Sequence, residues 1–341
     1  MRRMLATAAP ALAFVITALP VEILTPVAAL PAHLAGRVGD MVACGQARDG
    51  RYFIFDRRAH TVFAATPSRD EIRPIIQIGA EKGRLLQPTA FDLADDQTFV
   101  VADAPGGRGR IQVFHLSGAT LGGFLLPGRQ VPVIVLDGMV LSGIGSLEYT
   151  GQSVFISQPE TGALVTEYAL DGRAIRSFGS LRATGHEDDP NVHFALNAGL
   201  TVVNPRGGYY FVFLAGTPLF RKYDASGQLI FQRHIEGLEV DEYIRSIPGE
   251  WPRRRTAEGG ELPVVRPGVR AAAADAEGNL WISLTAPFTY VYDGDGDKRR
   301  TIQFRAAPGV MAPQALSFTR AGQVLVTPGC YTFPAKEPAS R

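Results

Sequence analysis

The sequence lacks the short motifs that most often identify an enzyme. It contains no G-x-S-x-G, H-E-x-x-H, G-x-G-x-x-G or P-loop pattern, and its two cysteines do not form a C-x-x-C pair. The local signatures of serine hydrolases, zinc proteases and nucleotide-binding proteins are therefore missing. The sequence alone leaves open whether the protein is an enzyme.

The chain also lacks an excess of either charge. It carries 34 basic and 33 acidic side chains, which gives a formal net charge of +1 at pH 7. Without residues 1–29, which contain Arg2, Arg3 and Glu22, the basic and acidic residues balance. A neutral chain has no electrostatic footprint for nucleic acid, so we expect no nucleic-acid partner.

Long apolar runs are missing except near the N-terminus. Arg2 and Arg3 precede an uncharged stretch over residues 5–19, and Val27-Ala28-Ala29 places small residues before a signal peptidase cut. This pattern predicts a signal peptide over residues 1–29, a periplasmic or secreted protein, and no membrane span after cleavage. An uncleaved anchor is the alternative, although the run is shorter than the ~20 residues that span a bilayer.

What the sequence does contain is a repeat. Short aliphatic strand cores recur after turns built on Gly or Asp, and they are centred on Ile54, Val101, Ile156, Val212, Ile282 and Leu325. Repeats of this period indicate one circular or stacked architecture rather than several domains. We therefore predict an all-β fold, a six-bladed β-propeller of four-stranded antiparallel blades over residues 30–341. A linear β-solenoid is the alternative, but its repeats are usually shorter and more regular.

The second repeat is the clearest. Residues 87–93 read as an inner strand, Asp95-Asp96 as a turn, and residues 98–103, 110–114 and 121–126 as three further strands. The stretch from Gln87-Pro88-Thr89 to Arg110-Ile111-Gln112-Val113-Phe114 resembles an NHL-type propeller repeat of the NHL and TolB-like superfamily, as does the string over residues 274–282. The resemblance implies a fold that ligand binders, protein scaffolds, lyases and lactonases share, so it specifies no activity.

The sixth repeat lacks an outer strand. A ring of blades has to close, and we expect an N-terminal strand around Leu34 to Val38 to complete the last blade. Cys44 lies in the first blade and Cys330 in the last, which are neighbours in a closed ring. Because an exported protein meets an oxidising compartment, we predict a disulfide between them. Two buried free thiols are the alternative.

Three segments between blades are longer than the repeat requires: residues 127–146, 179–195 and 236–268. Propeller topology places such connections on one face, where long loops on a rigid scaffold usually carry function. The second segment contains the densest set of metal-ligand side chains in the chain, and the third contains an aromatic residue beside arginines typical of binding sites. The candidate residues are His186, Asp188, His193, Trp251 and Arg254. A solvated polar loop and a surface strap are the respective alternatives.

The loops after the second strands of blades one and two contain further basic residues, Arg57, His60 and Arg108. These loops share the face of the three long segments. They would form a positive rim suited to carboxylate or phosphate groups. Rim salt bridges with Asp56 and Asp103 are the alternative.

We therefore predict an exported propeller that acts as a binding or interaction module for a protein or a small-molecule ligand. No cofactor is predicted. The alternative is a metal-assisted hydrolase or lyase at the tunnel mouth, which would hold a divalent cation with His186, Asp188 or His193. A gluconolactonase-like activity is disfavoured because Arg270 stands where that family places a metal ligand, and an Arg cannot coordinate a cation. A purely structural scaffold is a third interpretation.

Overall fold

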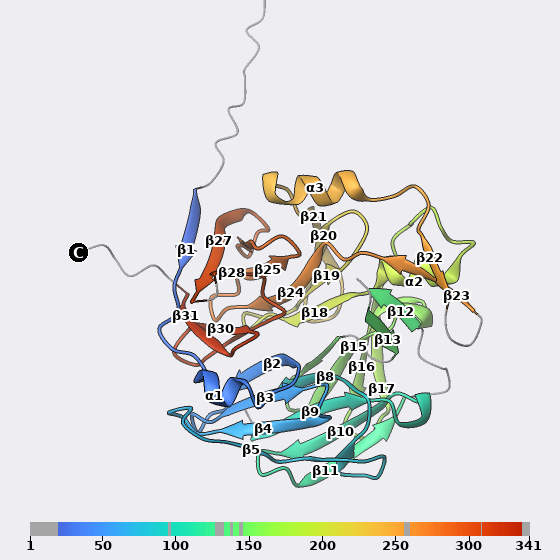
Figure 1. Ribbon diagram of the computed structural model, residues 1–341. Helices are drawn as coiled ribbons and strands as arrows, with labels where there is room; N and C mark the ends of the chain where they lie inside the picture. Colours follow the sequence, from blue (N-terminus) through green and yellow to red (C-terminus); the bar gives the residue numbers. More distant parts are fainter. Residues whose placement is uncertain are drawn as a thin grey trace, which may run out of the picture.

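The computed structural model describes residues 20–94, 97–126, 133–136, 139–142, 146–255, 260–307 and 309–335, with only the backbone for residues 133–142 (Figure 1). The predicted turn at 95–96, parts of the 127–146 segment and residues 1–19 of the predicted signal peptide lie outside the described residues.

Six antiparallel sheets surround a central axis, which confirms the predicted six-bladed all-β propeller. The first three blades each have four strands. Blade one consists of β2 (Met41–Gln46), β3 (Tyr52–Asp56), β4 (Thr61–Ala65) and β5 (Ile72–Pro74). Blade two consists of β8 (Pro88–Leu93), β9 (Thr98–Asp103), β10 (Arg110–His115) and β11 (Thr120–Leu125). Blade three consists of β14 (Leu147–Tyr149), β15 (Ser153–Ser157), β16 (Ala163–Ala169) and β17 (Ala174–Ser180).

Blades four and five keep this order, whereas the sixth has three strands. Blade four consists of β18 (Gly199–Val203), β19 (Tyr209–Phe213), β20 (Leu219–Tyr223) and β21 (Leu229–His234). Blade five consists of β24 (Val269–Ala274), β25 (Leu280–Leu284), β26 (Thr289–Tyr292) and β27 (Lys298–Ala306), with β28 (Gly309–Met311) and β1 (Val21–Leu24) added to β27. Blade six consists of β29 (Ala315–Phe318), β30 (Gln323–Thr327) and β31 (Tyr331–Pro334).

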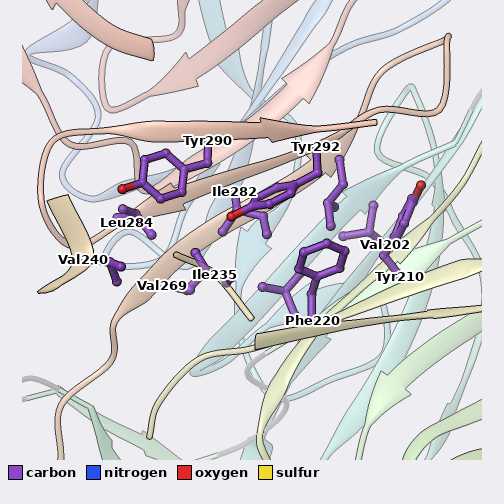
Figure 2. Close-up of a cluster of buried hydrophobic side chains, with 12 residues drawn as sticks. Val202, Tyr210, Phe220, Ile235, Val240, Val269, Ile282, Leu284, Tyr290 and Tyr292 are labelled. Carbon is purple, nitrogen blue, oxygen red and sulfur yellow. The ribbon is translucent and has the colours of Figure 1, made fainter. Parts of the chain in front are cut away.

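The core lies between neighbouring blades. All six predicted strand cores fall in the second strand of a blade, and each is at most 1% exposed. Aromatic side chains from the two middle strands fill the space between adjacent sheets, as Figure 2 shows for blades four and five. There Phe220 from β20 and Tyr292 from β26 face each other with ring centroids 4.8 Å apart. Burial of such large apolar surfaces is the main force that stacks the blades.

The ring is closed by residues that precede the predicted closing strand. Leu34 and Val38 belong to the short helix α1 (Ala32–Ala35) and to the loop after it, so the expected strand at 34–38 does not form. Instead, Val27 donates its N–H to the carbonyl of Thr332 in β31, and the N–H of Thr332 bonds to the carbonyl of Ala28. Pro31 immediately before the helix and Gly36 at its end restrict α1 to a single turn.

The predicted disulfide between Cys44 and Cys330 is present, with Cα atoms 5.7 Å apart. Cys44 lies in β2, next to the channel, and Cys330 lies in the turn between β30 and β31. The bond therefore joins the first blade to the last across the closure of the ring.

The long segments between blades build a second layer. It comprises α2 (Pro190–Asn197), α3 (Leu238–Ser246) and a four-stranded sheet of β12 (Val133–Leu136), β13 (Met139–Ser142), β22 (Arg253–Arg255) and β23 (Glu261–Val265). In Figure 1, α2, α3 and this sheet lie on the same side of the blades. The smaller elements are β6 (Gln77–Ile78), β7 (Arg84–Leu85) and the 3-10 turns η1 (Pro105–Gly107) and η2 (Pro159–Thr161). Within the described ranges, no helix is both long and apolar enough to cross a bilayer.

Candidate functional site

The three long segments contact one another over blades three to five, and we call the structure they form the insertion layer. β12 of the first segment pairs in parallel with β23 of the third, through Val135 with Val264. Helix α2 of the second segment packs on β23, and Trp251 covers the small apolar cluster between them. An ion pair between Asp189 and Arg253 joins the second segment to the third. The layer is thus a packed unit rather than three separate loops.

Arg182 anchors the insertion layer to blade four. Its guanidinium donates to the carbonyls of Leu196, at 2.5 Å, and Thr217, at 2.8 Å, and also to the carbonyl of Ala215. It lies 4.3 Å from the ring centroid of Phe213, a favourable cation–π arrangement. Burial, together with the nearby charge of Arg221, lowers the pKa of Arg182 to about 10, so the side chain remains charged at neutral pH.

Asn197 strengthens the same anchor. Its side-chain carbonyl accepts the N–H of Arg182 at 2.8 Å, and its amide donates to the carbonyls of Arg182 and His193. The side chain is completely buried. It therefore supplies the backbone of Arg182 with the two hydrogen bonds that a neighbouring strand would have provided.

Replacing Arg182 with Met is expected to lower the free energy of unfolding by about 2 kcal/mol, because three carbonyls lose their charged donor while the apolar stem is kept. Urea unfolding followed by fluorescence would measure the change. Arg173→Met is the matched control, since Arg173 is exposed and its guanidinium forms no hydrogen bond or ion pair among the described residues. Equal stability of the two variants would contradict the anchoring role.

The candidate metal ligands do not converge on a common point, and those that form bonds stabilise helix α2 and the loop before it. Nδ1 of His193 and the hydroxyl of Thr184 share a hydrogen bond of 2.8 Å, and Asp188 is exposed. Asp189, the N-cap of α2, accepts the N–H of Val192 and precedes Pro190, an arrangement that favours the start of a helix. Among the residues that the structure describes, no three His, Cys, Asp or Glu side chains are grouped so as to hold a metal ion.

The predicted positive rim is partly neutralised. Arg57 pairs with Asp40 at 2.9 Å, and Arg110 forms a bidentate pair with Asp103, whose carboxylate is buried. Arg108 is exposed in the loop of blade two, and His60 lies in the loop of blade one with a positive φ of 52°. Arg254 is exposed on β22 of the insertion layer.

Arg270 has a different environment. It is the second residue of β24, the innermost strand of blade five, and follows the third long segment directly. The strand bulges between Val269 and Ala271, and bulges of this kind redirect side chains next to functional sites. The side chain is partly buried, and its Nε is buried with no hydrogen-bond partner. Within the described ranges, its guanidinium forms no ion pair.

Two carboxylates that the sequence analysis did not single out lie on the innermost strands of blades two and three. Asp92 and Glu148 occupy equivalent positions, each two residues before the turn that follows the strand. Asp92 accepts the N–H of Tyr149 at 2.6 Å, and Glu148 accepts the N–H of Val203 at 3.0 Å. Each carboxylate thus satisfies an N–H on the channel edge of the next blade, which has no neighbouring strand.

The environment of this acidic pair opposes its ionisation. Burial raises the pKa of Asp92 to about 7, even though two backbone N–H groups favour its charged form. Burial and the charge of Asp92 together raise the pKa of Glu148 well above its usual range. The pair is therefore a pH-sensitive part of the joint between blades two, three and four.

A cavity of about 690 Å³ lies between blades five and six, at the end of the blades opposite to the insertion layer. Its walls include Glu22, Asp275, Arg299 and Arg300. These groups are already engaged: Arg300 with Glu22, Arg299 with Asp293, and Asp275 with the N–H groups of Asn279 and Trp281. The charged side chains named here are therefore already paired, whereas the guanidinium of Arg270 has no ion-pair partner among the described residues and is the better candidate to bind a charged ligand.

Comparison with known proteins reveals similarity of fold. No protein-family model matches the chain, and no curated protein matches it in sequence. Virginiamycin B lyase from Staphylococcus aureus superimposes with a TM-score of 0.52 at 10% identity, over 84% of this chain and 77% of the lyase. A gluconolactonase from Xanthomonas campestris superimposes with a TM-score of 0.51 at 15% identity, over 92% and 97% of the two chains. At these identities the similarity establishes the propeller fold and nothing further about this chain.

Proposed function

We propose that this protein is an exported binding module that captures a small anionic ligand, with a carboxylate or phosphate group, at the end of the channel beside the insertion layer. The observation that carries the proposal is the guanidinium of Arg270, partly buried and without a counter-ion among the described residues. Burying a charge without a partner is costly, and protein charges in such places are usually paired. A bound carboxylate or phosphate would supply that partner in the bidentate geometry that Arg favours.

Two further features support this placement. The third long segment leads directly into β24, and Val240 of its helix α3 packs against Val269 and Leu284 at the same end of blade five. The disulfide between Cys44 and Cys330 is typical of proteins in the periplasm or outside the cell, which supports export. The metal-assisted alternative receives less support, because His186, Asp188 and His193 do not converge as a ligand set.

Replacing Arg270 with Met is expected to separate binding from stability. Phosphate, sulfate, malonate and citrate would be titrated against the wild type and the variant at matched ionic strength, with thermal unfolding as the readout. We expect at least one anion to raise the midpoint of the wild type and none to raise that of Arg270→Met. Without anions, the variant should be as stable as the wild type or slightly more so, because an uncompensated charge is removed.

Arg254→Met is the control, since it removes the same charge from an exposed strand of the insertion layer. If the response to anions were kept in Arg270→Met and lost in Arg254→Met, the anion would bind at the insertion layer, and the proposed position of the site would be wrong. A wild type that responds to none of the anions would contradict the proposal.

A further inference from the structure

Strand β1 is built into blade five. It pairs in parallel with β27 over four residues, from Val21 opposite Thr301 to Leu24 opposite Phe304. The carboxylate of Glu22 accepts hydrogen bonds from Nε and Nη2 of Arg300, the closer at 2.6 Å. Figure 1 shows the strand lying along β27 at the rim of the molecule.

The alternation along β1 is that of a strand with one buried side. Leu24 is 2% exposed and packs in the core between blades five and six, whereas its neighbour Ile23 is 47% exposed. A strand that buries alternate residues against a sheet is a component of the fold rather than a passing tail.

The residues after β1 continue onto blade six. Val27 and Ala28 bond to Thr332 through both backbone groups, and the N–H of Leu30 bonds to the carbonyl of Gly329 at 3.2 Å. Leu30 is 5% exposed and packs with the core near the disulfide. One continuous segment, residues 21–30, thus covers the outer edges of blade five and of blade six. We call it the N-terminal clasp.

A cut after Ala29, the position suggested by Val27-Ala28-Ala29, would remove nearly all of the clasp. It would leave the outer edge of β27 open, take the carboxylate away from Arg300, and leave the N–H and carbonyl of Thr332 unpaired. Open sheet edges and unpaired buried charges are features that folded proteins avoid.

We propose that the leader is cut N-terminal to Val21 and that residues 21–30 remain in the exported protein as the clasp joining blades five and six. The cut is a hydrolysis, in which water adds across one peptide bond to give a carboxylate on the leader and a new α-amino group on the mature chain. This inference rests on the export that forms part of the proposed function.

The test is to express the full chain with its own N-terminus and a C-terminal tag in a bacterium, separate the periplasm from the cytoplasm, and determine the intact mass and N-terminal sequence. We expect periplasmic protein that still contains Val21 to Ala29. Periplasmic protein that begins at Leu30 would overturn the processing inference alone. An unprocessed chain confined to the cytoplasm would overturn both this inference and the proposed export.

A pair of variants in the same full chain tests the clasp independently of where the cut falls. Leu24→Ala is expected to lower the thermal midpoint of the purified protein by roughly 5 °C, and Ile23→Ala to leave it nearly unchanged, because only Leu24 is buried. Identical midpoints for the wild type and both variants would show that the segment is absent from the folded protein or does not contribute to it.

Discussion

Replacing Cys44 and Cys330 together with Ala is expected to lower the free energy of unfolding by about 5 kcal/mol. The bond closes a loop with a sequence separation of 286 residues, and chain-entropy models assign such long closures a stabilisation of this size. The location adds to the effect, because the bond joins the first and last blades, which the chain otherwise links only through the N-terminal clasp. Both cysteines are at most 5% exposed.

Denaturant unfolding of the wild type and the double variant, each with and without a reductant, would measure this contribution. The reductant should destabilise the wild type to the level of the variant and leave the variant unchanged. A wild type whose unfolding midpoint does not depend on the reductant, although mass spectrometry shows the bond reduced, would contradict the assigned role.

The regular part of the fold was predictable because it rests on local patterns. The aliphatic cores at Ile54, Val101 and Ile156 follow turn residues at a repeated distance, and alternation within each strand is a short-range signal. The disulfide could be predicted for a related reason, because the repeat number of each cysteine determines which blades it joins. These inferences needed only the order of elements along the chain.

The sequence analysis predicted the wrong closing segment, because the pattern of a strand and the pattern of a leader peptide overlap in the segment that closes the ring. Val21-Glu22-Ile23-Leu24 is a short alternating strand, but it directly follows an apolar run with the features of a leader, and small residues come after it. The strand at 34–38 was expected in its place, yet those residues pair with no strand. Which edge an N-terminal segment covers depends on contacts with residues nearly 300 positions away, and the local sequence does not encode them.

The candidate site shows the same limit. Asp188 and His193 suggested ligands by the density of such side chains around them. In the structure Asp188 is exposed, His193 shares a hydrogen bond with Thr184, and the neighbouring Asp189 caps α2 and pairs with Arg253. Arg270 was noticed only as a residue that could not bind a metal. That it lacks a counter-ion within the described part of the chain depends on where its neighbours in space lie, so a sequence pattern could not reveal it.

The sequence analysis could have identified Asp92 and Glu148 only by comparing the inner strands of the blades with one another. Each stands two residues before a turn, and aligning the six inner strands on that turn places both carboxylates in one layer around the channel. The other blades carry Gly45, Val202, Ala273 and Ser317 at this position. The hydroxyl of Ser317 also bonds to the next blade, but as a donor, to the carbonyl of Cys44. In blades two, three and six, side chains of this layer therefore reach across and bond to the inner strand of the next blade.

Two carboxylates in such a layer make the stability of the protein depend on pH. Since both pKa values are raised in the folded state, the folded protein holds more protons than the unfolded chain between about pH 4 and pH 7. The stabilisation is fully present below the unfolded pKa values near 4 and is lost as the pH rises through the folded value of about 7. From Asp92 alone we expect a loss on the order of 4 kcal/mol across that window, at roughly 1.4 kcal/mol for each pH unit per proton, and Glu148 adds to it in the same direction.

Glu148→Gln should remove the part of this dependence that Glu148 contributes, without breaking the joint. Gln keeps the oxygen that accepts the N–H of Val203 and cannot ionise, so Asp92 no longer faces a second negative charge. The variant is expected to match the wild type near pH 4 and to be more stable than it at pH 8, by about 2 kcal/mol in urea unfolding. Glu242→Gln, on the exposed surface of α3, is the control and should follow the wild type at every pH. If Glu148→Gln lost stability with rising pH as steeply as the wild type, the carboxylates of blades two and three would not be coupled, and the dependence would have to arise elsewhere in the chain.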